Sequence, residues 1–157
     1  MTSSIYTILP ATEADARELG PMLRAQDRAE VEALGAEPEA ALLTSVQNAA
    51  EAWTGRADGE IVCMWGVCPA TLIGPTGIPW LLGSDLVPLH RKVFLRENKR
   101  WVAHALDLFP LLRNVVDARY AEAIRWIKWL GFTLHAPRAM GIHGEAFIPF
   151  TMEAANA

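Results

Sequence analysis

Few residues in this chain have the types and spacing that acid–base chemistry requires. Glu60 and Asp117 are carboxylates that could act as a general base toward an amine, and Tyr120 carries a hydroxyl that could donate a proton. Each also has an ordinary structural interpretation. Glu60 would be solvated after a hairpin turn, Asp117 would end a strand and cap the next helix, and Tyr120 would pack through its ring. We therefore assign no catalytic residue.

The cysteines and histidines show no metal-binding pattern. Cys63 and Cys68 are the only cysteines, and their spacing on an extended segment would point the two side chains to opposite faces. We expect two buried, reduced thiols with no bridge between them. No metal site is predicted, because no metal-ligand spacing connects the histidines, which are His90, His104, His135 and His143.

Length and composition indicate one domain over residues 1–157. The chain has 157 residues, of which 52% are hydrophobic and 20% charged, as in ordinary globular proteins. The net charge of -4 argues against a nucleic-acid partner. No apolar run approaches the ~20 residues of a membrane span, and the N-terminus lacks the features of a signal peptide. We therefore expect no membrane attachment and a cytosolic location.

The elements that must position these residues are clearest over 111–136. Residues 111–116 form a short apolar run typical of a buried strand, and the apolar residues of 120–130 recur at helical spacing. Gly131 can take the left-handed conformation that ends this helix, and an extended pattern resumes at Phe132. A strand, a helix and a strand in direct succession predict an α/β or α+β fold.

The other segments extend this pattern to an α+β fold with a mixed, mostly antiparallel sheet of about six to seven strands and helices on both faces. Pro149 places the final strand on an edge, because proline cannot donate to a ladder. The other predicted strands are 4–9, 50–56, 60–67, 78–83 and 146–151. Helices over 12–20, 21–35 and 37–49 follow the first strand, an Asp58-Gly59 hairpin turn follows the second, and a long helix runs from Asp85 or Pro88 to Phe109. Loops are predicted at 71–77 and 137–144.

Residues 120–132 resemble the last helix of the GNAT (N-acetyltransferase) fold, whose usual form is N-x-x-A-x-x-x-Y-x-K-x-G-F. Gly131 and Phe132 match this form, and Lys128 lies one position before its lysine. Tyr120 stands in place of the asparagine, and Ile127 replaces the tyrosine that can protonate the leaving thiolate. The predicted order of elements is also the GNAT order. The resemblance therefore implies a single GNAT-like domain.

The same resemblance implies an acetyl-CoA site where the fourth strand meets the long helix. GNAT enzymes bind the pyrophosphate there through an R/Q-x-x-G-x-G/A loop with free backbone amides. The turn here reads LGSDLVPLHR, lacks those glycines, adds the negative charge of Asp85 and loses an amide at Pro88. We predict no cofactor, with acetyl-CoA as the alternative, and a vestigial cleft at Gly83, Ser84, Asp85, Arg91 and Tyr120.

In acetyltransferases, the strands that correspond to 78–83 and 111–116 splay apart, and CoA lies between them. Unpaired backbone groups in a dry gap cost about 1 to 3 kcal/mol each. We therefore expect the gap either to be filled by side chains, Trp80 and Trp126 first among them, or to be open to a partner segment. The stretch 90–100 also holds five of the chain's 14 basic residues. It could meet the CoA 3′-phosphate, DNA in a capsid or an acidic partner, or form the solvated side of the long helix.

A second resemblance covers about residues 28–153. The segment VEALGAEPEAALLTSV, the WxxGSDLV strand end, the basic long helix, and IRWIKWLGFTLH followed by GEAFIPFTM are similar to the internal virion protein A family of short-tailed phages. That family is acetyltransferase-shaped, is encoded near ejection proteins and lacks the pyrophosphate loop. The resemblance implies a phage or prophage protein of the host cytoplasm or virion. It would act in virion assembly by contacting phage structural or ejection proteins.

Two other functions stay open. One is an active GNAT-type N-acetyltransferase with an atypical acetyl-CoA loop. The other is a small-molecule sensor that uses the cofactor cleft. Binding of acetyl-CoA separates the first from a protein that acts only through protein contacts.

Overall fold

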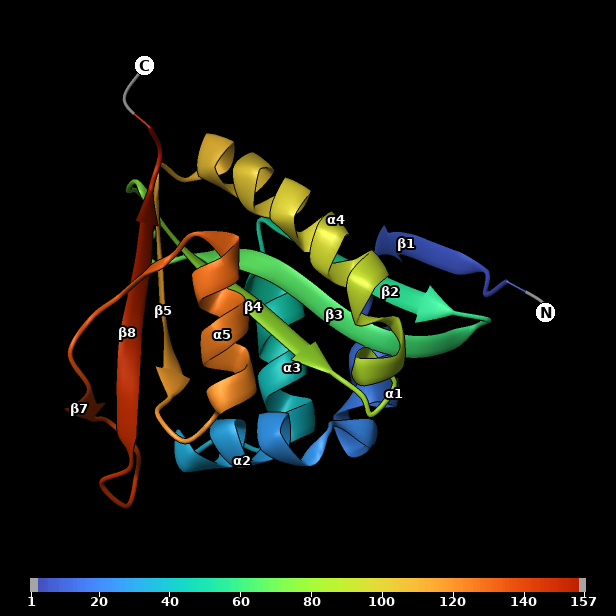
Figure 1. Ribbon diagram of the computed structural model, residues 1–157, viewed down its shortest axis with the longest axis horizontal. Helices are drawn as coiled ribbons and strands as arrows, with labels where there is room; N and C mark the ends of the chain where they lie inside the picture. Colours follow the sequence, from blue (N-terminus) through green and yellow to red (C-terminus); the bar gives the residue numbers. More distant parts are fainter. Residues whose placement is uncertain (1–2, 156–157) are drawn as a thin grey trace.

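A mixed eight-stranded sheet runs through the molecule, and the computed structural model describes residues 3–155 (Figure 1). The strand order is β1-β2-β3-β4-β5-β8-β6, with β7 also paired to β8. Among the strands of residues 3–155, only β4 and β5 pair in parallel, which confirms the predicted mixed, mostly antiparallel α+β class. The elements are β1 (Tyr6–Pro10), α1 (Glu13–Leu19), η1 (Gly20–Met22), α2 (Ala25–Ala33), α3 (Pro38–Asn48), β2 (Glu51–Ala57), β3 (Glu60–Pro69), β4 (Thr76–Gly83), α4 (Val87–Leu108), β5 (Leu111–Asp117), α5 (Ala121–Leu130), β6 (Thr133–Leu134), β7 (Arg138–Ala139) and β8 (Ala146–Glu153).

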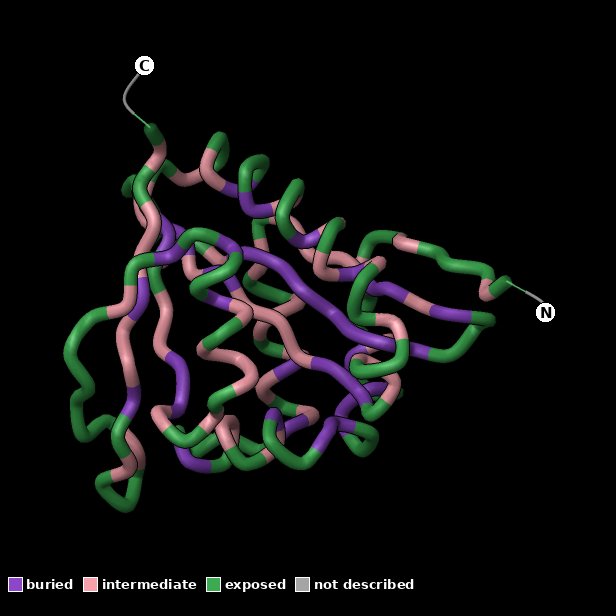
Figure 2. Tube along the Cα trace, viewed as in Figure 1, coloured by how far each residue is buried: buried purple, intermediate pink, exposed green. Residues whose placement is uncertain are grey.

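Helices cover both faces of the sheet, as predicted. On one face, α4 and α5 bury Val102 and Ile127 against β5 and β8. On the other face, α1 and α3 bury Leu19 and Leu42 against β3. Figure 2 shows the resulting core as a continuous buried band along β3, which lies between the two helical layers.

Three local signals in the sequence produce the structures expected from them. Thr12 caps α1 by accepting the Asp15 N–H at 3.1 Å, and the Asp15 carboxylate accepts the Thr12 N–H at 3.0 Å. Asp58 and Gly59 turn the β2–β3 hairpin with φ angles of 51° and 83°. Gly131 ends α5 with a φ of 105°, in the left-handed region that glycine enters at little cost.

The prediction of a helix over 21–35 is wrong for its first residues. Gly20–Met22 form a short 3-10 turn, and α2 begins only at Ala25. The chain between them is extended because Leu23 bridges to Ser84, and the Arg24 N–H donates to the Gly83 C=O at 2.9 Å. Bonding to the end of β4 therefore replaces helical bonding, and this contact sets the position of α2.

The final strand is also not at the edge of the sheet, contrary to the prediction from Pro149. β8 pairs with β5 on one side and with β6 and β7 on the other. The Pro149 C=O accepts the His135 N–H at 2.8 Å, just beyond the end of β6. The nitrogen and the carbonyl of a strand residue face the same neighbouring strand, so the Pro149 nitrogen also faces the chain just beyond β6. Because β6 has only two residues and has already ended there, the N–H that proline lacks is not needed for pairing.

The two predicted loops are shorter than expected. Thr76 and Gly77 belong to β4 because they pair with the start of β5. Arg138–Ala139, inside the predicted turn over 137–144, form the two-residue strand β7 against β8. These short pairings bring the strand number to eight.

Candidate functional site

The site lies where β4 and β5 diverge. The two strands pair only through Thr76 with Leu111 and Gly77 with Leu112. The next β4 residue whose nitrogen faces β5 is Pro79, which has no N–H to donate, so the parallel ladder cannot continue there. Figure 1 shows the two strands separating beyond this point. The predicted splay is therefore present, and a proline marks its beginning.

The Asn114 side chain connects the strands at the point of separation. Its Nδ2 donates to the Pro79 C=O at 2.7 Å, and its Oδ1 accepts the Val115 N–H at 2.8 Å. A continuing ladder would bond the Val115 N–H directly to the Pro79 C=O. The Asn114 amide is inserted between these two backbone groups and satisfies both.

Two carboxylates of α2 hold the far ends of the same strands. Asp27 accepts the Gly83 N–H of β4 at 2.7 Å, and Glu30 accepts the Asp117 N–H of β5 at 2.9 Å. Tyr120 donates its hydroxyl to the second oxygen of Asp27, also at 2.7 Å. Because Asp27 and Glu30 lie one helical turn apart, a single helix spans the opening between the strands.

Burial raises the pKa values of Asp27, Glu30 and Tyr120. Burial raises the pKa of Asp27, against the hydrogen bonds from Tyr120 and Gly83 that lower it. Burial also raises the pKa of Glu30, to about 7, against the hydrogen bond from Asp117. The pKa of Tyr120 is raised as well, by burial and by the adjacent Asp27. Tyr120 therefore keeps its proton at neutral pH and shares it with Asp27.

A largely apolar cavity of about 530 Å³ occupies the space between the strands and reaches both helical layers. Trp80 and Trp126 line it without closing it, so of the two predicted outcomes the gap is the open one. Ser84 donates its N–H to the Val62 C=O of β3, and the alternation of that ladder directs the Leu81 N–H and C=O toward the cavity. We refer to this cavity as the cleft.

The turn from β4 into α4 offers few donors to an anion. The N–H groups of Gly83 and Ser84 bond to Asp27 and to the Val62 C=O. Leu86 and Val87 donate to the Ser84 side chain and C=O, at 3.3 and 3.2 Å. These four amides are therefore already bonded within the protein, which leaves few donors for a phosphate at this turn.

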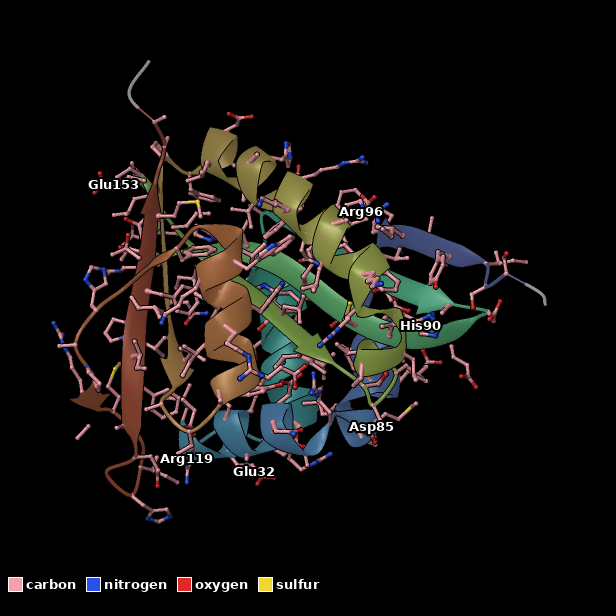
Figure 3. All side chains as sticks on the ribbon, in the orientation of Figure 1. Glu32, Asp85, His90, Arg96, Arg119 and Glu153 are labelled. Carbon is pink, nitrogen blue, oxygen red and sulfur yellow. The ribbon has the colours of Figure 1, made fainter. Side chains whose placement is uncertain are left out.

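Side chains complete this closure of the turn. A Cβ placed on Gly83 would lie 2.4 Å from Cγ2 of Val87, so the Val87 side chain fills the space beneath the turn. Pro88 supplies no N–H. Asp85 is exposed at the outer bend between β4 and α4, where it adds negative charge (Figure 3). The residues of this turn do not fit the pyrophosphate of acetyl-CoA.

The predicted cleft residues are only partly brought together. Arg91 and Tyr120 line the cleft, and Gly83 is connected to Tyr120 through Asp27. Ser84 is buried and donates its hydroxyl to the Ile61 C=O at 2.8 Å, away from the cleft. Asp85 does not line the cleft.

Two of the candidate acid–base residues, Glu60 and Asp117, lie where the structure gives them ordinary structural roles. Glu60 is exposed at the hairpin. Asp117 accepts hydrogen bonds from the backbone and guanidinium of Arg119, which lower its pKa.

Cys63 is a buried free thiol, and Cys68 is a half-buried one. Among residues 3–155, no cluster of three His, Cys, Asp or Glu side chains could hold a metal ion, and no helix of the same part of the chain could cross a membrane.

Sequence reasoning missed the residues that organise the cleft. Pro79 and Asn114 stand inside predicted strands, where a proline and an asparagine are unusual, so both residues could have indicated an interruption of the sheet. Asp27 and Glu30 gave no signal, because carboxylates on a short polar helix are usually solvated. Only the tertiary arrangement brings them to the strand ends.

Solved structures share this architecture. A putative acetyltransferase from Acinetobacter baylyi superposes with a TM-score of 0.73 at 13% identity, covering 99% of this chain and 97% of that one. A GNAT-family acetyltransferase from Streptococcus pneumoniae gives 0.65 at 16%, covering 96% and 100%. The putative acetyltransferase yncA from Salmonella typhimurium, solved with acetyl-CoA, gives 0.63 at 14%, covering 97% and 95%.

These likenesses show that the chain has the GNAT acetyltransferase-like fold, as the resemblance of 120–132 implied. At such identities they show the fold alone. No protein-family model and no curated protein matches the sequence.

Proposed function

We propose that this chain is an acetyltransferase-fold protein that acts through protein contacts and does not transfer acetyl groups. The observation that carries the proposal is the internal bonding of the cleft. Asn114, Asp27 and Glu30 occupy backbone groups along both splayed strands, and the α4 turn uses its own amides. A cofactor would have to displace hydrogen bonds that the protein already makes, and it would meet the charge of Asp85.

The setting that we propose is a phage or prophage particle. The support is the resemblance of short segments within 28–153 to the internal virion protein A family, which also lacks the pyrophosphate loop. The protein would work in the host cytoplasm or the virion, with phage structural or ejection proteins as partners. Purification of a tagged chain from infected cells, followed by mass spectrometry, tests this setting. Enrichment of metabolic enzymes without virion proteins would contradict it.

The absence of acetyl transfer is tested by titration with acetyl-CoA. We expect no heat of binding and no rise in melting temperature at ligand concentrations of about 1 mM, because a ligand stabilises a protein only when it binds the native state. The yncA protein, which was solved with acetyl-CoA, serves as the positive control. Stabilisation by several degrees would overturn the proposal.

A second experiment asks whether the turn alone prevents binding. The triple variant Asp85→Asn, Val87→Gly and His90→Gly restores glycines and removes the negative charge. We expect it to fold and still not bind, because Asn114, Asp27 and Glu30 keep the strand groups bonded. Micromolar binding by this variant would show that the cleft is a preformed cofactor site.

An active N-acetyltransferase with an atypical loop is the second candidate, and one observation favours it. The cleft of about 530 Å³ is open, and the Leu81 backbone faces it. An extended ligand could bond to that backbone. Release of free CoA from acetyl-CoA in the presence of polyamines or peptides would support this candidate.

A further inference from the structure

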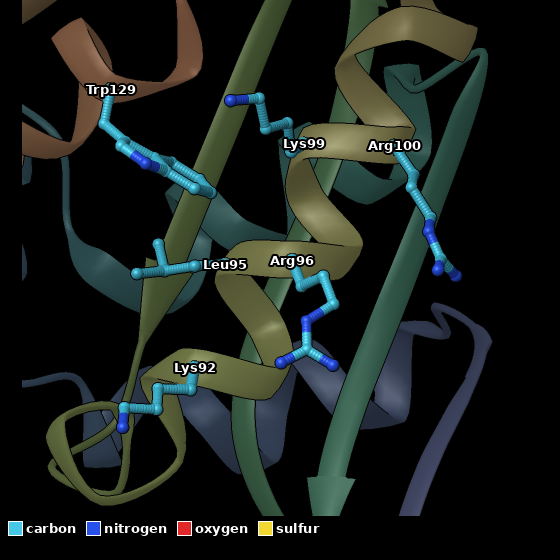
Figure 4. Close-up of a pocket in the computed structure, with 6 residues that line it drawn as sticks. All are labelled: Lys92, Leu95, Arg96, Lys99, Arg100 and Trp129. Atoms are coloured by element: carbon cyan, nitrogen blue, oxygen red, sulfur yellow. The ribbon is translucent and has the colours of Figure 1, made fainter.

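The outer side of α4 forms a basic groove against α5, which adjoins the cleft at Leu95 and Trp129 and lies apart from the turn and the strand ends described above (Figure 4). It encloses about 490 Å³ at the surface. Its side chains come from three successive turns of α4 and the last turn of α5. They are Lys92, Leu95, Arg96, Lys99, Arg100 and Trp129.

The cations of this groove are scarcely neutralised by the protein. Within residues 3–155, only Arg100 among them has a carboxylate at ion-pair distance, Glu97 at 3.5 Å. The same α4 stretch belongs to a chain whose net charge is -4. Positive charge is therefore concentrated in one place on an acidic protein, and it is available to an external anion.

The groove also has an apolar component. Trp129 is 49% exposed, and Lys99 lies over its ring with Nζ 4.4 Å from the centroid. Leu95 lines the same groove. In Figure 4 the Trp129 ring and the Leu95 side chain lie on one side of α4, where Lys99 reaches toward the ring, and Arg100 extends from the other side of the helix. An exposed tryptophan near arginines matches the enrichment of these two residue types in protein-binding anchors.

We propose that this groove binds an acidic polypeptide segment with a central apolar side chain. Carboxylates of the segment would pair with the four cations, and the apolar side chain would rest on Trp129 and Leu95. From Lys92 to Arg100 the helix rises about 12 Å, the length of roughly four extended residues. A short segment of a partner protein fits this size. A long nucleic acid is disfavoured, because the rest of the acidic surface would repel it.

The experiment measures fluorescence anisotropy of a labelled polyglutamate peptide with a central tryptophan, at low salt. Its controls are the same peptide with glutamine for glutamate, and an oligothymidylate of equal length. The double variant Arg96→Glu and Lys99→Glu removes the central cations. The double variant Arg17→Glu and Arg138→Glu makes the same change in net charge at exposed positions of α1 and β7, outside the groove.

We expect the acidic peptide to bind wild type and the Arg17/Arg138 variant alike, and to bind the Arg96/Lys99 variant at least about tenfold more weakly. Trp129→Ala should weaken binding by about fivefold, because it removes the apolar contact and the ring beneath Lys99 but leaves all four cations. Equal loss in both double variants would overturn the proposal, since it would report net charge alone. Tighter binding of the oligothymidylate than of the acidic peptide would also overturn it. The proposed function is tested by acetyl-CoA titration and the groove by peptide binding, so the failure of one proposal can be distinguished from the failure of the other.

Discussion

The two ends of the β4–β5 pair are held together by different means. At the end formed by Thr76, Gly77, Leu111 and Leu112, the strands bond directly through their backbones. At the other end, the bonds pass through the side chains of Asn114, Asp27 and Glu30. Backbone pairing tolerates most substitutions, whereas side-chain pairing depends on individual residues. Truncation of a single side chain can therefore remove a hydrogen bond at the cleft end, whereas it leaves the backbone bonds of the other end in place.

The largest effect is expected at the side-chain end, for Asp27→Ala. This change leaves the Gly83 N–H and the Tyr120 hydroxyl without partners, and each unsatisfied group costs about 1 to 3 kcal/mol. We expect a loss of about 4 kcal/mol in the free energy of unfolding, measured in urea. Asp27→Asn keeps one acceptor and should lose about half as much. If the two variants were equally stable, the hydrogen bonds would not be the cause.

Gly77→Val tests the backbone-paired end. A Cβ at this position would lie 2.7 Å from Cδ2 of Phe109 and from Cγ2 of Val67, so a larger side chain forces core atoms apart. Overpacking of this kind costs about 3 kcal/mol. Amide hydrogen exchange should show the opening at Leu111, whose N–H donates to the Pro75 C=O, with Asp117 still protected. Exchange spreading first to Asp117 would mean that the two ends are not independent.

Asn114→Ala removes the inserted amide. The Val115 N–H and the Pro79 C=O then lose their partners unless water enters the cleft. We expect a loss of about 2 kcal/mol, smaller than for Asp27→Ala because this site adjoins the cavity. Asn114→Asp is the matched control, since its carboxylate can accept from Val115 but cannot donate to Pro79. A fully stable Asn114→Ala protein would show that the strands do not need the bridge.

The fold could be predicted because its signals are local. The Asp58-Gly59 turn and the Gly131 helix end act through the conformations of single residues, and their positive φ angles follow from residue type. The apolar spacing of α5 likewise chooses its buried face. Pro149 shows where local reasoning is incomplete. Proline does lack the N–H that pairing uses, but β8 still lies inside the sheet, because its neighbour β6 is so short that it ends before this N–H would be needed.

The site could be predicted only in outline. The altered α4 turn was visible in the sequence, because Asp85 and Pro88 change charge and donors locally. The hydrogen bonds that hold the strand ends beside the cleft were not visible, because they connect residues far apart in the chain. Asp27 and Gly83 are 56 positions apart, and Glu30 and Asp117 are 87. No spacing rule relates such pairs, so their contact emerges only when the sheet and α2 are assembled.

The smallest effect concerns pH and the Glu30 carboxylate. Burial raises its pKa from 4.5 to about 7, so the native protein holds this proton more tightly than the unfolded chain does. Its contribution to stability is therefore fully present below about pH 4.5 and is lost as pH rises toward about 7, with no further loss above that range. The ionised side chain is half-buried, and solvent screening reduces the expected loss to about 1 to 2 kcal/mol.

Glu30→Gln isolates this contribution, because the amide oxygen can still accept the Asp117 N–H but cannot ionise. The variant should be more stable than wild type at about pH 7.5 and similar to it at about pH 4.5. Asp27, whose pKa is also raised, leaves a residual slope of the same sign in both proteins. Urea unfolding at several pH values gives the comparison. Parallel curves for the two proteins would mean that Glu30 does not change its protonation on folding, and that α2 holds β5 by a hydrogen bond whose strength is independent of pH.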